Sequence, residues 1–361
     1  MPRTPTAIDT TPRQLAALIH HHCRMADLAA TDGRRPLALM IWGDGGLGKS
    51  RITEQVAHAT GRRYLDFRAM IKDLPDLQGY PILSGMEQNR PAPMTAPADL
   101  PPSDSLDPWI VVLEELPGAP RMMQAALYGL VLEGRLNSYT LPRNTLIVAT
   151  GNLATSGGVV NAMPFPLRSR FRHTELILAP DEMLEHAMQT GWHPLVTAYH
   201  TMTRGADWLA FDAKSTEATY ACPRSWEAVS DTLKAGMIPA DLLTPMLAGS
   251  LGYGIGSKFA AFVRLASTLS ATVGTMRTDP QNCPIPEDSA AQWFLAATTA
   301  AQMTVQDTSW AFPFLARLSD ELCVFAVNAA YNRLPAIART PDFQKHFALN
   351  PKLAALSAYC K

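Results

Sequence analysis

Residues 43–50 form a glycine-rich run that ends in a lysine and a serine, Gly-Asp-Gly-Gly-Leu-Gly-Lys-Ser. The run satisfies the pattern G-x-x-x-x-G-K-[ST], in which the backbone N–H groups of a loop surround phosphate oxygens. In such a loop the Lys49 side chain reaches the β- and γ-phosphates, and the Ser50 hydroxyl binds Mg²⁺. The pattern therefore predicts a site for a nucleoside triphosphate and Mg²⁺.

The sequence on either side of this loop fits the setting that the pattern requires. Residues 37–42 are an apolar run that indicates a buried strand, and residues 52–59 have helical periodicity and are closed by Gly61. The N-terminus of that helix directs its positive dipole end toward the phosphates. A strand, a glycine-rich loop and a helix in this order favour a phosphate site over an ordinary glycine-rich turn.

Hydrolysis also needs a carboxylate that organises the metal ion and the attacking water. Residues 109–115, Trp-Ile-Val-Val-Leu-Glu-Glu, indicate a buried strand that ends in two acids. We expect Glu114 to act on the metal, directly or through water, and Glu115 to orient and deprotonate the nucleophilic water. Taken singly, the same pattern is also typical of a strand that runs into an exposed acidic turn.

The elements that must position these side chains are the strands of a parallel sheet. Residues 36–178 alternate short apolar runs with helical stretches, as parallel strands joined by crossover helices do. Asn152 follows one of these strands, where it can hold the water or the γ-phosphate, although asparagine is also a common turn residue. Five strands are predicted, at 37–42, 63–67, 109–113, 145–150 and 174–178.

The rest of the chain is predicted to be mainly helical. Residues 11–30 have the periodicity of an amphipathic helix, residues 81–108 are proline-rich, and strand signals stop after residue 179. A turn-rich stretch at 273–287 separates two helical blocks. The predicted parts are an N-terminal helix (1–34), an α/β nucleotide-binding domain (35–178), a helical domain (179–272) and a C-terminal helical extension (273–361).

Composition limits the function classes. The chain has 361 residues, a formal net charge of −1 and 17% charged residues, against about 25% in typical soluble domains. The neutral charge argues against a nucleic-acid partner, which favours a Lys/Arg-rich surface. No apolar run approaches the ~20 residues of a membrane span, and the first residues lack the apolar core of a signal peptide. The five cysteines have no metal-ligand spacing and are expected to be reduced thiols in a cytoplasmic protein.

The phosphate loop, the strand with paired acids and the strand that ends in asparagine together resemble the AAA+ ATPases. The resemblance is to their MoxR-like, helix-2-insert branch, the dynein-related subfamily associated with von Willebrand factor A (VWA) domains. It runs from about residue 35 to 270. Four further segments carry it: 73–79 resembles the segment before the helix-2 insertion, 136–142 the hairpin before the sensor strand, 163–171 the arginine-finger segment and 222–226 the sensor-2 segment.

The resemblance implies a role for each matching residue. Glu114 and Glu115 correspond to the Walker B pair, with Ser50 and Glu114 holding Mg²⁺. Asn152 corresponds to sensor 1, and Arg224 to sensor 2, which contacts nucleotide in its own subunit. The residues implied to surround ATP are Gly43, Asp44, Gly45, Gly46, Leu47, Gly48, Lys49, Ser50 and Arg51.

Arg170 corresponds to the arginine finger, which reaches the γ-phosphate held by the next subunit. Two features depart from the family pattern or leave it open. The first Walker B acid is usually aspartate, whereas here it is Glu114, whose longer side chain changes the geometry and can slow turnover. Arg168 stands two residues before Arg170 and can share or take the role of the finger.

The implied protein is a cytoplasmic ATP hydrolase, with ATP and Mg²⁺ as cofactors. It forms a homo-oligomeric ring, a hexamer in the family pattern. The resemblance implies that ATP hydrolysis drives chaperone-like remodelling or maturation of a protein partner, one that contains a VWA domain. Two alternatives stay open: an ATP-gated oligomeric scaffold or switch with little hydrolysis, which Glu114 favours, and a nucleic-acid motor, which the neutral charge disfavours.

Overall fold

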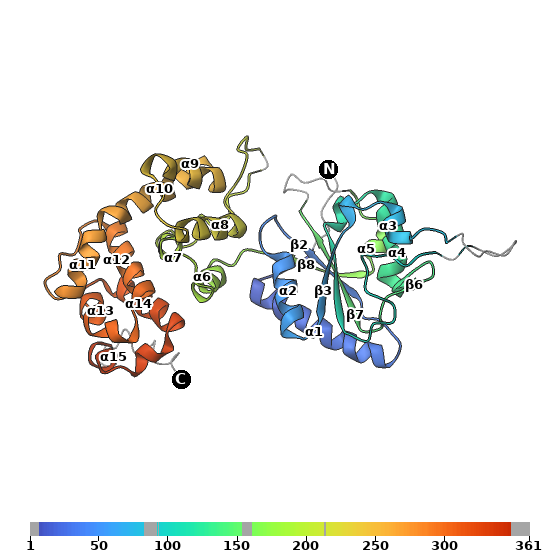
Figure 1. Ribbon diagram of the computed structural model, residues 1–361, viewed down its shortest axis with the longest axis horizontal. Helices are drawn as coiled ribbons and strands as arrows, with labels where there is room; N and C mark the ends of the chain where they lie inside the picture. The colour runs from blue at the N-terminus through green and yellow to red at the C-terminus, as the bar shows by residue number, and fades with distance from the viewer. Residues whose placement is uncertain (1–6, 83–91, 93, 154–160, 213, 348–361) are drawn as a thin grey trace. The chain divides into compact units, whose positions relative to one another are not determined.

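The computed structural model describes residues 7–82, 92, 94–153, 161–212 and 214–347 (Figure 1). Much of the proline-rich 81–108 stretch, namely 83–91 and 93, therefore lies outside the described residues, as does the end of the predicted C-terminal extension. The chain divides into two compact units, Met1–Ala179 and Pro180–Lys361. In the described residues no helix combines the length and the apolar character needed to cross a membrane.

Unit 1 contains a parallel sheet of six strands in the order β1-β8-β2-β7-β4-β3. Three interior strands, β2, β7 and β4, are apolar and buried on both faces, as parallel strands covered by crossover helices are. Parallel pairing brings the carboxyl ends of all six strands to one edge. The strands are β1 (Ile8–Thr10), β2 (Ala38–Trp42), β3 (Arg63–Arg68), β4 (Trp109–Glu114), β7 (Thr145–Gly151) and β8 (Phe171–Leu176).

The parallel α/β sheet is confirmed, but the prediction of five strands is wrong because β1 was not expected. This strand has only three residues and is largely exposed, so it carries no apolar signal. Threonines attach it to β8. The Thr10 and Thr174 hydroxyls lie 3.0 Å apart, and Thr174 also donates to the Ile8 carbonyl at 3.0 Å. These contacts join residues more than 160 positions apart, which no local pattern reveals.

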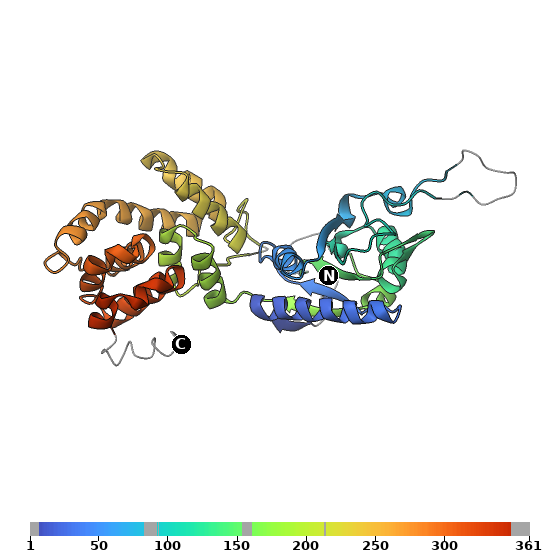
Figure 2. The ribbon, with the colours of Figure 1, turned by 60° about the horizontal axis from the view of Figure 1, so that its bottom comes forward.

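Helices cover both faces of the sheet. Figures 1 and 2 show α1 and α2 on one face and α3 and α4 on the other. On the α4 face Met123, Leu127 and Leu130 pack against inward residues of β2, β4 and β7. The remaining elements of unit 1 are α1 (Pro12–Thr31), α2 (Lys49–Ala59), η1 (Ala69–Ile71), α3 (Leu74–Gln78), η2 (Leu116–Gly118), α4 (Arg121–Glu133), the hairpin β5 (Arg135–Leu136) and β6 (Tyr139–Thr140), and α5 (Phe165–Arg168).

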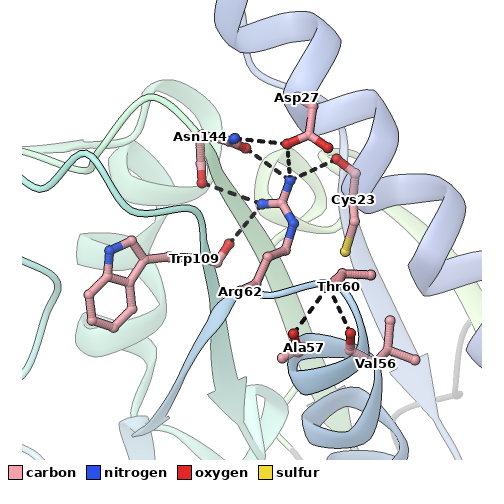
Figure 3. Close-up of polar contacts among 8 residues, drawn as sticks. All are labelled: Cys23, Asp27, Val56, Ala57, Thr60, Arg62, Trp109 and Asn144. Carbon is pink, nitrogen blue, oxygen red and sulfur yellow. Dashed lines mark hydrogen bonds and ion pairs between the residues drawn. The ribbon is translucent and has the colours of Figure 1, made fainter.

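A buried arginine attaches α1 to the amino-terminal ends of three strands (Figure 3). The Arg62 guanidinium donates to the carboxylate of Asp27 and, at 2.9 Å, to the Cys23 carbonyl, both on α1. It also donates to Oδ1 of Asn144 at 3.0 Å and to the carbonyls of Asn144 and Trp109 at 3.4 Å. The Arg62 side chain is only 2% exposed, so these acceptors replace water as its partners.

Unit 2 consists of helices in its described residues. α7 packs against α8 and α10, and α12 packs against both α7 and α14. α11 extends to Thr278, so the stretch predicted to be turn-rich from 273 is irregular only after that residue, and the predicted boundary at 272/273 falls inside a helix. The helices are α6 (Pro180–Gln189), α7 (Pro194–Met202), α8 (Pro223–Lys234), α9 (Ala240–Leu251), α10 (Tyr253–Thr268), α11 (Ser270–Thr278), α12 (Ser289–Gln302), η4 (Val305–Asp307), α13 (Thr308–Leu315), α14 (Asp320–Arg333), η5 (Pro335–Arg339) and α15 (Pro341–His346).

The core of the α7–α8–α10 block holds a buried histidine. The His200 ring stacks on Trp208 with ring centroids 3.4 Å apart and meets the edge of Trp226 at 4.3 Å. Neither ring nitrogen has a hydrogen-bond partner among the described residues. Burial therefore lowers the pKa of His200 well below its ordinary value.

The Arg62 cluster predicts a change in the attachment of α1. Arg62→Met leaves buried carbonyls without a donor, so we expect the free energy that holds α1 in place to fall by about 3 kcal/mol. This is the lower end of the range for a broken buried pair, because the half-exposed Asp27 returns to water. Hydrogen–deuterium exchange of α1 amides in the full chain measures this loss. Asp27→Asn keeps an acceptor for Arg62 and is the matched control, with an expected change below about 1 kcal/mol. Wild-type protection of α1 in Arg62→Met would contradict the prediction.

The buried His200 predicts acid sensitivity of unit 2. Its pKa is lowered in the folded chain, so below pH ~6.5 the unfolded chain binds the extra proton and stability falls, by up to ~1.4 kcal/mol per pH unit. His200→Phe keeps a ring on Trp208 and removes this contribution. Burial also lowers the pKa of His193. Because His193 is present in both proteins, its contribution to the pH dependence of stability is the same in both. Urea unfolding, followed by tryptophan fluorescence between pH 5.5 and 7.5, should show that the free energy of unfolding depends less on pH in the variant than in the wild type. Equal pH dependence in the two proteins would refute the prediction.

Candidate nucleotide site

The glycine-rich loop joins the carboxyl end of β2 to α2. Gly43, Gly46 and Gly48 have φ angles of 148°, 81° and 95°, a region that residues with a Cβ rarely adopt. A Cβ on Gly43 would also lie 2.8 Å from the Leu176 carbonyl oxygen. α2 begins at Lys49, three residues before the predicted start at 52, because the loop runs directly into the first helical turn.

Lys49 joins this loop to the end of β7. Its side chain is buried, and its ammonium donates to the carbonyls of Gly43 at 2.7 Å and Asp44 at 2.9 Å. It also donates to Oδ1 of Asn152 at 3.1 Å. A phosphate oxygen at this position would give the ammonium a charged acceptor, and charge-assisted hydrogen bonds are about twice as strong as neutral ones.

The two acids lie at the carboxyl end of β4, next to β7. Oε2 of Glu114 accepts a hydrogen bond from the Thr150 hydroxyl at 2.5 Å, and that hydroxyl accepts one from the Glu115 N–H at 3.0 Å. Oε1 of Glu114 is buried and has no hydrogen-bond partner among the described residues. A buried carboxylate oxygen without a hydrogen-bond donor is suited to bind a cation, directly or through a water molecule. A ligand of Mg²⁺ does the same. Ser50, the second residue of α2, would supply the hydroxyl ligand.

Glu115 has a strained backbone. Its φ is 52°, in the left-handed region, and its carbonyl accepts a hydrogen bond from the Gly118 N–H at 2.7 Å. A non-glycine residue in this conformation costs about 1–3 kcal/mol, which proteins tolerate mostly at functional sites. The side chain is exposed at the end of the strand, where it can reach a water molecule.

Sequence reasoning missed two residues of this edge. Thr150 holds both acids, and the only signal for it is a hydroxyl near the end of an apolar strand. Arg68 ends β3 in register with Glu114 and pairs with Asp66 at 3.0 Å. The hydrogen bond to Asp66, together with the negative charges of Asp66 and of the two acids, raises the pKa of the Arg68 guanidinium. The predicted strand stopped at residue 67, one position short of this arginine.

Four other predicted residues lie in the loop and in the first turn of α2, and one lies in unit 2. Asp44 and Gly45 lie in the loop beside Lys49, Leu47 is buried beneath it, and Arg51 is exposed in the first turn of α2. These four stay predictions as nucleotide contacts. Arg224 is exposed in the first turn of α8, in unit 2, and its role also stays a prediction.

The two candidate finger arginines lie at the junction of α5 and β8. The Arg168 guanidinium lies over the Phe165 ring, 5.4 Å from its centroid. Arg170 is exposed, and its guanidinium has no hydrogen-bond or ion-pair partner in the part of the chain that the structure describes. Of the two, Arg170 is the side chain that is free to contact a second molecule.

Comparison with known proteins gives little beyond this geometry. No family model and no curated protein matches the chain. Solved structures of RuvB variants from Thermotoga maritima are similar to it. One is 15% identical over 70% of this chain and 75% of its own, with a TM-score of 0.35, and another is 14% identical over the same shares, with a TM-score of 0.36. A third is 13% identical over 93% and 91%, with a TM-score of 0.32. A likeness at such identities and TM-scores carries no functional information.

The unpaired oxygen of Glu114 predicts a metal-dependent change in binding. Glu114→Gln removes the negative charge from this position, so we expect the Mg²⁺ concentration for half-maximal binding of a fluorescent ATP analogue to rise roughly 10-fold. Binding without Mg²⁺ should stay within about 2-fold of wild type, since the loop and Lys49 are untouched. Glu133→Gln, which neutralises an exposed acid at the end of α4, is the control. An unchanged Mg²⁺ dependence in Glu114→Gln would exclude Glu114 from the metal site.

Proposed function

We propose that this chain is an AAA+ ATPase of the MoxR-like branch, which hydrolyses ATP at interfaces between subunits of a ring. The observation that carries the proposal is the hydrogen bond between Lys49 and Asn152, 3.1 Å long, beside the two acids of β4. A phosphate-binding lysine, a polar sensor and a pair of carboxylates at one sheet edge are the groups that phosphoryl transfer to water requires.

In the proposed reaction each residue has one task. Lys49 binds the β- and γ-phosphate oxygens, and Asn152 exchanges its contact with Lys49 for the attacking water or the γ-phosphate. Glu115 accepts a proton from that water as it attacks. Glu114, held by Thr150, would bind the metal, directly or through water. Mg²⁺, when bound, neutralises the charge that develops on the phosphate oxygens.

Arg170 completes the site in trans. An arginine finger contributes about 10³–10⁵ in turnover, equivalent to roughly 4–7 kcal/mol of barrier. A single subunit whose finger faces solvent would therefore hydrolyse ATP very slowly. We propose that assembly brings Arg170 of one subunit to the nucleotide of the next, and that the resulting movements remodel a protein partner with a VWA domain.

A second candidate function is an ATP-gated scaffold that assembles but turns over little. The observation that favours it is Glu114 at the position where the family pattern has aspartate. One result distinguishes this function from the first. ATP would stabilise the ring, but the ring would release phosphate no faster than the monomer does.

The test combines light scattering with phosphate release in ATP and Mg²⁺. Wild type should form an ATP-stabilised ring that releases phosphate, and Glu115→Gln and Arg170→Ala should assemble but lose at least about 10³-fold in turnover. Arg172→Ala, which removes an exposed arginine two residues away on β8, is the matched control for Arg170 and should keep its activity.

Mixing the two inactive variants tests the action in trans. In a random equimolar mixture about one quarter of the interfaces pair an intact Glu115 with an intact Arg170, so phosphate release should return to roughly that fraction of wild type. A monomer that hydrolyses ATP as fast with Arg170→Ala as without it would overturn the ring mechanism.

A further inference from the structure

Trp42 joins the phosphate loop to β8. It is the last residue of β2, directly before Gly43, and it is buried. Its indole Nε1–H donates to Nδ1 of His173 at 2.9 Å, and the two rings are nearly parallel, with an interplanar angle of 16°. The proposed reaction uses neither side chain.

The second nitrogen of His173 contacts the arginine segment. Nε2 lies 2.8 Å from the carbonyl oxygen of Arg168. An indole N–H can only donate, so Nδ1 of His173 must be the acceptor. The proton of the neutral imidazole is therefore on Nε2, which donates to the Arg168 carbonyl. One tautomer satisfies both contacts, and protonating Nδ1 would break the bond to Trp42.

The Arg168 carbonyl needs such a donor. Arg168 is the last residue of α5, and β8 begins three residues later, so the helix supplies no further N–H for this carbonyl. The turn is otherwise held by N–H groups, including Arg170 N–H to the Leu167 carbonyl at 3.0 Å. His173 thus fixes the plane of the Arg168–Ser169 peptide, one peptide before Arg170.

On its other side Trp42 lies against the strand that carries the sensor asparagine. A Cβ on Gly151 would lie 3.0 Å from the Trp42 ring and 2.5 Å from the end of the Met40 side chain, so the backbone before Asn152 packs tightly on this core. Trp42 is therefore a rigid anchor at the end of β2, and His173 extends from it to the arginine segment.

We infer that His173 is a positioning residue, which sets the direction of Arg170 by holding the Arg168 carbonyl against the Trp42 anchor. The inference rests on the proposed function, since it acts through an arginine that works on the neighbouring subunit. It makes His173 necessary in the subunit that donates the finger and dispensable in the subunit that receives it. A residue that only stabilised the fold would be needed equally in both.

The mixing experiment separates these roles. His173→Phe removes both hydrogen bonds and keeps an aromatic ring in the core. Placed in the finger donor, as Glu115→Gln with His173→Phe mixed with Arg170→Ala, it should lower the recovered phosphate release roughly 10- to 100-fold, as a misplaced catalytic group does. Placed in the receiver, as Arg170→Ala with His173→Phe mixed with Glu115→Gln, it should leave recovery within about 3-fold of the parental pair.

Two further variants control for folding. His173→Gln carries an acceptor and a donor on one planar amide, so in the donor it should restore most of the recovery that His173→Phe loses. Trp42→Phe in the donor removes the anchoring N–H and keeps a ring, so a partial loss is expected even if His173→Phe fails to assemble. Light scattering in ATP shows whether each variant forms the ring.

Each outcome decides one point. Loss in the donor alone, rescued by His173→Gln, supports the positioning role. Equal loss in donor and receiver, with recovery intact in the parental pair, overturns the role of His173 and leaves the proposed function standing. No recovery in the parental pair overturns the trans-acting arginine itself, and the inference with it.

Discussion

The parallel register of β4, β7 and β2 is the constraint on which the rest of the site depends. Leu113 pairs with Ala149, and Trp42 pairs with Gly151, so the residues that follow each pair meet at the carboxyl edge of the sheet. A slip of one residue would turn Glu114 and Thr150 to opposite faces and break their hydrogen bond. The fully buried apolar strands prevent that slip, because it would expose or unpack side chains along their whole length.

The two ends of the parallel sheet carry different polar clusters. At the amino-terminal edge Arg62 has acceptors for its buried guanidinium in α1, β4 and the residue before β7, so that cluster is closed and structural. At the carboxyl edge an oxygen of Glu114 has no partner in the described part of the chain, and Glu115 has a strained backbone. Unsatisfied groups and strain are destabilising, and their presence beside a phosphate loop is typical of a site that a ligand completes.

The sequence allowed the parts of this site with local signals to be predicted. The phosphate loop has a fixed spacing, and the strands before Glu114 and Asn152 are apolar runs with clear ends. The parts held by distant contacts could not be predicted. β1 depends on threonine pairing across the sheet, Thr150 has meaning only beside the acids, and His173 becomes informative only when Trp42 lies against it. The roles predicted for Arg170 and Arg224 come from the resemblance alone, because each would act on something outside its own unit or subunit.

The strand order places the inferred positioning contact, from Trp42 through His173 to the Arg168 carbonyl, directly beside the phosphate loop. β2 lies between β7 and β8, so the strand that enters the phosphate loop contacts both the strand before Asn152 and the strand after Arg170. A ligand shifts such a system only if it binds two arrangements with different affinity. Phosphate bound at the loop would compete for the Lys49 ammonium, which now donates a hydrogen bond to Asn152, and would thereby alter the ends of β2 and β7 together. Trp42 and His173 connect that same end of β2 to the arginine segment. In a ring, the nucleotide state of one site would then alter the arginine that serves the next site, with no contact between the two nucleotides.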